Sequence, residues 1–158
     1  MGAPLAERAG TAPQIGPRYR LGPNNLADML DENIKSLAQA KNFAAFTTLL
    51  PSGQPMTHVM WVDADDEHIL INTEVGRQKA LNVKRDPRVT VTVIDADNPY
   101  HYGEVRGTVV EEVTGPEARA GIDKLSLKYT GKPYDPNAIK TERVLLRIAP
   151  ERQRTNGA

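Results

Sequence analysis

The chain contains no cysteine, only three histidines and only eight aromatic residues among 158. Without cysteine the protein has no thiol nucleophile, no disulfide framework and no Cys-ligated zinc or iron–sulfur site. His58, His68 and His101 are too far apart in sequence to form a local histidine metal motif. We therefore expect no metal site, and any redox chemistry has to come from a bound organic cofactor.

Long apolar runs and a net charge are also missing. No stretch approaches the roughly 20 apolar residues of a membrane span, and the amino terminus lacks the charged-then-apolar layout of a secretory signal. The 20 basic and 20 acidic side chains cancel, which argues against a protein that wraps nucleic acid or lies on an anionic membrane. We expect a cytoplasmic protein with no nucleic-acid partner and no membrane span.

The length of 158 residues suits one domain with an ordinary hydrophobic core. Residues 1–23 are rich in Gly, Pro and Ala without apolar periodicity, which predicts a flexible amino-terminal arm. Residues 24–150 form the predicted domain, and residues 151–158 are predicted to be a polar carboxyl-terminal tail.

Apolar periodicity predicts a mainly β protein with some helix. Alternating patterns bounded by turn signals predict about six strands, at residues 43–50, 56–62, 68–73, 89–94, 100–113 and 144–148. Helical spacing predicts a first helix capped by Asn24 or Asn25, a short helix over 77–85 and a long helix over 116–130. Short antiparallel strands with tight turns favour a closed α+β barrel over a parallel sheet.

Charge is distributed unevenly along the chain. Residues 60–75 carry a net charge of −5, residues 76–91 a net +4 and residues 95–112 a net −4. The basic block begins where a strand ends and a helix starts, and it combines a strand-end hydroxyl, a glycine, free helix amides and two cations. These features lie in Thr73, Gly76, Arg77, Gln78 and Lys79. A phosphate is the natural occupant of such a segment, and a solvated basic helix face is the alternative interpretation.

The strand predicted over residues 56–62 is a second candidate ligand-binding segment. Met56, His58 and Met60 share one face of it, whereas Thr57, Val59 and Trp61 share the other. A flat ligand ring could lie along this strand and take hydrogen bonds from its backbone. The alternative is an ordinary core strand in which Trp61 serves as packing.

Acid–base residues are not evident from the sequence. His58 and His101 are candidate proton donors because imidazole titrates near neutrality, but neither has a carboxylate at an informative spacing. Tyr102 lies after a Pro-containing turn, where it forms either a stacking wall for a planar ligand or a rim aromatic. No Ser-His-Asp set, HExxH, Walker loop or GxGxxG is present, so the catalytic residues stay unassigned.

Several of these segments, taken together, resemble a known family. They are Ser52-Gly53-Gln54-Pro55, Trp61, Ile71-Asn72-Thr73, Gly76-Arg77-Gln78-Lys79, Asn82-Val83 and Arg85-Asp86-Pro87-Arg88-Val89. The set resembles the pyridoxamine-5′-phosphate-oxidase-like split β-barrels, and over residues 26–149 it is most similar to their actinobacterial deazaflavin branch. The chain departs from the vitamin B6 oxidase proper at its carboxyl end, where that enzyme's substrate-binding motif has no match. Pyridoxamine phosphate is therefore not the expected substrate.

The resemblance implies a homodimer of six-stranded antiparallel split barrels, each with two or three flanking helices and with cofactor sites at the subunit interface. It implies that the strand from His58 to Trp61 lies along the cofactor ring and that Thr73, Arg77, Gln78 and Lys79 hold the phosphate. It also implies that partner residues, near Tyr100 to Tyr102 or in the carboxyl-terminal strand, complete the pocket. The implied function is a reductase that passes a hydride from reduced coenzyme F420 to a small planar unsaturated or quinone-like acceptor. The alternatives are an FMN-binding oxidoreductase or a non-enzymatic carrier of a cofactor or haem.

Overall fold

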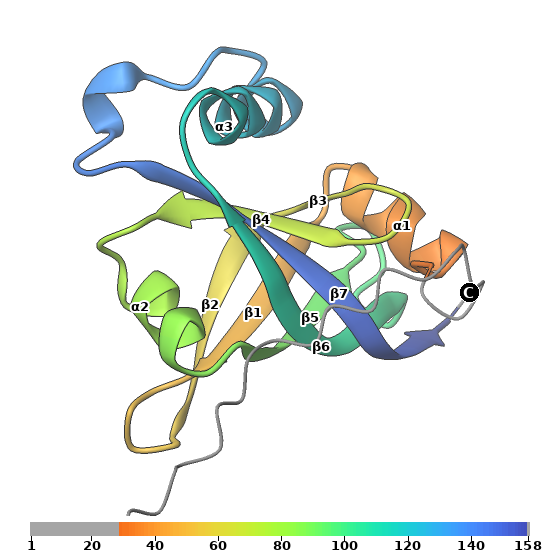
Figure 1. The fold of residues 1–158 in the computed structure, drawn as a ribbon. Coiled ribbons are helices and arrows are strands. Elements are labelled where there is room, and N and C mark those ends of the chain that lie inside the picture. Colours follow the sequence, from red (N-terminus) through yellow and green to blue (C-terminus); the bar gives the residue numbers. More distant parts are fainter. Residues whose placement is uncertain (1–28, 158) are drawn as a thin grey trace, which may run out of the picture.

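A computed structural model describes residues 29–157 of the chain. A seven-stranded antiparallel sheet curls into a half-barrel, with three helices around it (Figure 1). The strands are β1 (Phe43–Leu49), β2 (Pro55–Trp61), β3 (Asp63–Ala64), β4 (Ile69–Glu74), β5 (Arg88–Ile94), β6 (Tyr102–Val113) and β7 (Arg143–Asn156). The helices are α1 (Glu32–Gln39), α2 (Gln78–Arg85) and α3 (Pro116–Thr130), with a 3₁₀ turn at Pro136–Ala138.

The strand order is β2-β1-β5-β6-β7-β4-β3. β7 pairs with β6 along nearly its whole length and with β4 through its first half, from Arg143 opposite Glu74 to Ile148 opposite Ile69. The outer strand β2 contacts β4, so the sheet curls back on itself. β4 thereby comes close to β2, although β2 and β3 are the two edge strands of the sheet. The predicted α+β split barrel is confirmed, with the two-residue β3 making seven strands in place of six.

The carboxyl-terminal strand is longer than its sequence pattern predicts. We expected it to end near Ile148 and to be followed by a polar tail from residue 151, but β7 continues to Asn156 in register with β6. Its second half carries exposed or half-exposed side chains, so the apolar alternation that marks a strand is absent there. Ladder pairing with β6 holds this half in the sheet, and the Gln153 side chain also bonds the Asp31 amide and the Met29 carbonyl.

The first helix begins later than predicted. Asp31 caps it, and its carboxylate accepts the amides of Asn33 at 2.9 Å and Ile34 at 3.3 Å. The predicted caps Asn24 and Asn25, like the predicted arm at residues 1–23, lie outside the described residues. The long helix α3 begins at Pro116 and ends before Gly131, whose φ of 74° suits glycine, as expected.

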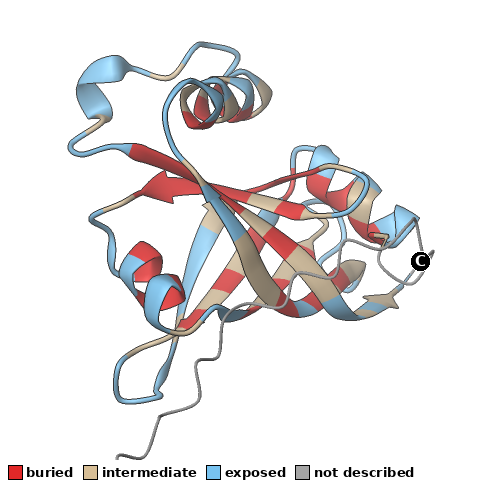
Figure 2. Ribbon diagram, in the orientation of Figure 1, coloured by how far each residue is buried: buried red, intermediate tan, exposed pale blue. Residues whose placement is uncertain are grey.

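Buried apolar side chains from α1, α2 and the strands fill the barrel (Figure 2). Phe46, Ile34 and Ile71 are among the largest of them and have at most 1% of their surface exposed. A smaller cluster under α3 contains Ile122, Leu125 and Tyr129, against which Trp61 packs. The main core holds α2 against β1, and it therefore fixes where the basic block lies.

Candidate functional site

The predicted basic block lies at the junction of β4 and α2. Thr73 and Glu74 end β4 and are buried, and a tight turn closed by the bond from the Arg77 amide to the Glu74 carbonyl, 3.0 Å, leads into α2. A Cβ at Gly76 would lie 3.3 Å from the Thr141 side chain, so a larger residue fits in this turn only if that side chain shifts by a few tenths of an ångström. The turn presents the amino terminus of α2 with Arg77 exposed beside it.

Lys79 is the most informative residue of the block. Only 7% of its surface is exposed, and within residues 29–157 its amino group has neither a hydrogen-bond nor an ion-pair partner. Burial, reinforced by the positive charges of Arg77 and Arg143, lowers the pKa of its amine. In the same part of the chain, the backbone amides of Gln78 and Lys79 also lack an acceptor. Unpaired cations and free amides at a helix amino terminus are the features that bind an anion.

Glu74 balances part of this positive charge. It is 2% exposed, and its Oε2 accepts the amides of Lys140 at 3.1 Å and Thr141 at 2.9 Å as well as the Thr141 hydroxyl at 3.1 Å. Burial alone would raise the pKa of Glu74, but these hydrogen bonds and the nearby Arg143 together lower it. Its other oxygen lies 3.5 Å from Arg143 Nη1 and 3.8 Å from Arg77 Nη2.

Arg143 is a residue of this cluster that the sequence pattern missed. It opens β7, 64 positions after Lys79, and reaches the block because the β4–β7 register places it opposite Glu74. No local spacing could have identified it, since the signal is a long-range strand pairing.

Gln78, which we expected to offer a side-chain hydrogen bond to the phosphate, uses its amide otherwise. Its Nε2 donates to Asn82 Oδ1 at 2.8 Å, and Asn82 in turn donates to Thr48 Oγ1 at 2.9 Å. This chain of bonds fastens α2 to β1. What Gln78 offers freely is its backbone amide.

The strand β2 has the two faces predicted for it. His58 lies opposite the buried Phe46 of β1, so Met56, His58 and Met60 share the concave side, whereas Val59 and Trp61 share the outer side. The strand is nevertheless an outer one, paired in the ladder with β1 alone, and Val59 is 74% exposed. The core-strand alternative is therefore wrong for Val59, although Trp61 does pack, stacking on Tyr129 with ring centroids 5.1 Å apart.

A row of ring contacts joins β2 to the cation cluster. Tyr134 meets Trp61 edge-on, with centroids 6.5 Å apart, and the Arg143 guanidinium lies 5.3 Å from the Tyr134 ring. An exposed strand suited to a flat ring and a cluster suited to a phosphate therefore belong to one continuous surface. Tyr102 lies outside this row of ring contacts, at the start of β6. The strand register places it in line with Trp61, with β1 and β5 between them.

The histidines do not enter this surface together. His58 is exposed on β2, whereas His101 lies in the β5–β6 connection with its Nδ1 2.8 Å from Asp95 Oδ2. The sequence shows no carboxylate at an informative spacing from His101, but the turn after β5 brings Asp95 beside it. His68 forms a similar pair with Asp65, at 3.2 Å.

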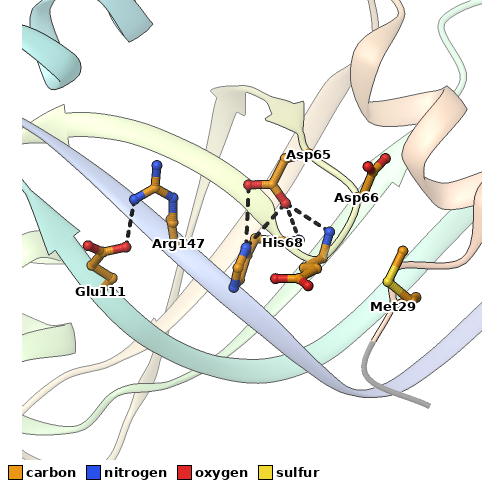
Figure 3. A pocket seen from close by; sticks show the side chains of 7 residues that line it. Met29, Asp65, Asp66, His68, Glu111 and Arg147 are labelled. Atoms are coloured by element: carbon orange, nitrogen blue, oxygen red, sulfur yellow. Dashed lines mark hydrogen bonds and ion pairs between the residues drawn. The ribbon is translucent and has the colours of Figure 1, made fainter. Parts of the chain in front are cut away.

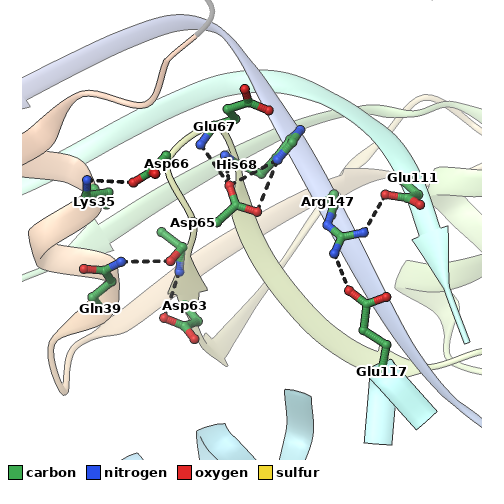
Figure 4. A network of polar contacts seen from close by, with 11 residues as sticks. Lys35, Gln39, Asp63, Asp65, Asp66, Glu67, His68, Glu111, Glu117 and Arg147 are labelled. Carbon is green, nitrogen blue, oxygen red and sulfur yellow. Dashed lines mark hydrogen bonds and ion pairs between the residues drawn. The ribbon is translucent and has the colours of Figure 1, made fainter. Parts of the chain in front are cut away.

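Two open surface pockets of the described chain lie away from the cation cluster. One of about 710 Å³ lies between the β3–β4 turn and β7, where Asp65, His68 and Arg147 line it (Figure 3). A polar network surrounds it and joins Arg147 to Glu111 and Glu117 (Figure 4). The other, of about 690 Å³, is lined by His101 and Asp95 together with residues of α1.

The fold and the candidate site define a class: an antiparallel split β-barrel in which cations and free amides gather at a helix start near an exposed outer strand. A family model described as pyridoxamine 5′-phosphate oxidase matches residues 30–157. The chain belongs to this family. No curated protein sequence gives a significant match.

Solved structures support the same assignment. An F420 reductase is 35% identical with a TM-score of 0.70, covering 79% of this chain and 98% of the other. A conserved hypothetical protein from Mycobacterium tuberculosis is 30% identical with a TM-score of 0.61, covering 82% of this chain and 87% of the other. General stress protein 26 from Bacillus anthracis, 21% identical with a TM-score of 0.58 and covering 79% and 92%, shares the fold. Within residues 29–157, none of the helices is long and apolar enough to cross a bilayer.

Proposed function

We propose that the protein is an F420-dependent oxidoreductase that passes a hydride from the reduced deazaflavin to a small planar acceptor, unsaturated or quinone-like. The observation that carries the proposal is Lys79, a buried side chain whose amine has no partner among residues 29–157 and lies beside two backbone amides of α2 that have no acceptor there. This arrangement suits the phosphate of a flavin-type cofactor. The 35% identity to an F420 reductase favours the deazaflavin over FMN.

Nine of the eleven predicted cofactor-binding residues have a direct role in this proposal. Lys79 and Arg77 neutralise the phosphate, while Thr73 and the Gln78 amide add hydrogen bonds. The backbone of β2 around Val59 and Met60 orients the ring, and the side chains of Met56, His58 and Trp61 flank it. When bound, the reduced deazaflavin supplies the hydride, so the chain itself needs only to bind, orient and exclude water. The accompanying proton comes from solvent, since His58, the histidine of β2, has no carboxylate partner within the described residues and the His68 and His101 pairs lie on other elements.

A second copy of the chain completes the proposed site. Trp61, Phe43, Ile94 and Tyr102 lie in one row across the outer face of β2, β1, β5 and β6. Phe43 is 45% exposed and Val59 is 74% exposed, which is a large apolar surface for a monomer to leave open. We infer a homodimer in which the partner covers this face and brings its own β6 toward the cofactor. Sedimentation of the purified protein measures this directly, and a monomer at micromolar concentration would contradict it.

Cofactor identity is tested by titrating the purified protein with coenzyme F420, FMN and haem. We expect F420 to bind most tightly, and reduced F420 to be reoxidised only when an acceptor is added. Tighter FMN binding, together with a yellow protein on purification, would favour the FMN-dependent alternative. Haem binding without turnover would favour a carrier.

The phosphate assignment is tested with Arg77→Ala/Lys79→Ala. Each charge-assisted bond contributes about 1.5–3 kcal/mol, so the double variant should lose several kcal/mol of cofactor binding at most. Unchanged affinity in that variant would remove the phosphate from this segment.

A further inference from the structure

The cation cluster has more positive charge than its own carboxylate can balance. Arg77 and Arg143 both face one acidic side chain, Glu74, and Lys79 lies close enough to both arginines to feel their charges. Lys79 and Arg143 are each at least nine-tenths buried. Burial, with a further contribution from Arg77, lowers the pKa of Arg143, as it does that of Lys79. Buried cations in excess are costly unless an anion accompanies them.

Arg143 is held rigidly in this cluster. Its Nε donates to Asn72 Oδ1 at 2.9 Å, its Nη1 lies 3.5 Å from Glu74, and its guanidinium lies over the Tyr134 ring. Asn72 is fixed in turn, since its Nδ2 donates to the Ala118 carbonyl of α3 at 2.8 Å. Of the two terminal nitrogens, Nη2 has no partner within residues 29–157. A pre-oriented guanidinium loses little conformational entropy when it binds an oxyanion.

We propose that Arg143 is a third ligand of the cofactor phosphate, supplied by β7 to the site that β4 and α2 begin. This inference rests on the proposed function for the place of the phosphate, and it adds a residue from the other end of the domain. The phosphate would then join β4, α2 and β7, and the pairing of Arg143 opposite Glu74 would be a requirement for binding as well as for the sheet. It applies equally to the phosphate of a deazaflavin and to that of FMN.

The experiment compares cofactors with and without a phosphate in wild type and Arg143→Gln. Affinity for F420 or FMN should fall about 10- to 100-fold in the variant, the range expected for one charge-assisted bond. Affinity for riboflavin, which has the same ring as FMN but no phosphate, should change less than about twofold if Arg143 acts on the phosphate alone. An equal loss for riboflavin and FMN would overturn the proposal, since it would show a structural role, and so would unchanged FMN and F420 affinities.

Two further variants complete the test. Arg147→Gln removes another arginine of β7 whose partners are Glu111 and Glu117, and it should leave both affinities unchanged. Arg143→Lys keeps the charge without the planar fork, and it replaces the glutamine variant if that variant does not fold. Its affinity for FMN or F420 should fall about 3- to 10-fold. An affinity equal to that of the wild type would contradict the proposal.

The outcome separates the two proposals. If the wild type prefers FMN to F420, the cofactor assignment fails while the FMN–riboflavin comparison still tests Arg143. If the wild type binds neither cofactor, pyrophosphate serves as the probe: stabilisation against heat in wild type but not in Arg143→Gln supports the anion site. Absence of stabilisation in the wild type overturns it.

Discussion

Replacing Lys79 by methionine should make the cofactor-free protein more stable and the cofactor complex weaker. Methionine keeps most of the buried stem of the lysine but removes an amine that has no partner in the described chain and is repelled by Arg77 and Arg143. Without its desolvation cost, the free energy of unfolding should rise by about 0.5–1 kcal/mol. Cofactor binding should lose about 1.5–3 kcal/mol, which is roughly a 10- to 150-fold weaker dissociation constant.

Both quantities can be measured with one probe. Trp61 is the only tryptophan of the chain and belongs to the row of ring contacts that leads to the cation cluster. Its fluorescence should follow urea unfolding without cofactor, and its quenching should follow the titration with F420. Lys84→Met on the same helix is the matched control, because Lys84 is exposed, and we expect both quantities to stay at wild-type values. Two results for Lys79→Met would refute the reasoning. One is a loss of more than about 1 kcal/mol in the free energy of unfolding, because removal of an unpaired amine should not destabilise the protein. The other is an affinity for F420 equal to that of the wild type.

Three other predictions concern the barrel and its titratable groups. Gly107→Ala should lower the free energy of unfolding in urea by at least about 2 kcal/mol, because the new Cβ would lie 2.1 Å from the Ala149 carbonyl oxygen at a β-bulge. An unchanged stability would mean that the backbone at the bulge can shift to make room. Burial lowers the pKa of Lys128 to about 8, so between about pH 8 and 10.5 the unfolded state binds more protons than the folded state and the free energy of unfolding should rise with pH. Relative to Lys128→Met the rise should be about 1–2 kcal/mol, after allowing for the partial exposure of the side chain. A difference between the two proteins that does not change with pH would contradict the lowered pKa. His101→Ala should keep turnover with reduced F420 within about tenfold of wild type, whereas a loss of 10²–10⁴-fold would identify the His101–Asp95 pair as the proton donor.

The sequence alone was sufficient for the elements whose signals are local. Alternation in β1 and β5 and the capping glycine of α3 are signals carried by a few neighbouring residues, and each matches the structure. The charge reversal at residue 76 is equally local, and it falls between the end of β4 and the start of α2. The extension of β7 was missed because its outer half is paired but not buried, and hydrophobic pattern reports burial. The start of α1 was misplaced because Leu30 is buried before the helix begins, so an apolar position was counted as a helical one.

What the sequence by itself determined is the composition of the site: a hydroxyl, a glycine, two cations and a helix start within seven residues, next to a strand that fits a flat ring. Only the tertiary structure decided that Lys79 is buried with no partner for its amine among residues 29–157, that Gln78 turns its side chain to Asn82, and that Arg143 joins the cluster. The physical reason is that a charge in sequence has no partner until the chain folds. Partnership depends on strand register and on the curl of the sheet, which join residues that are 64 positions apart.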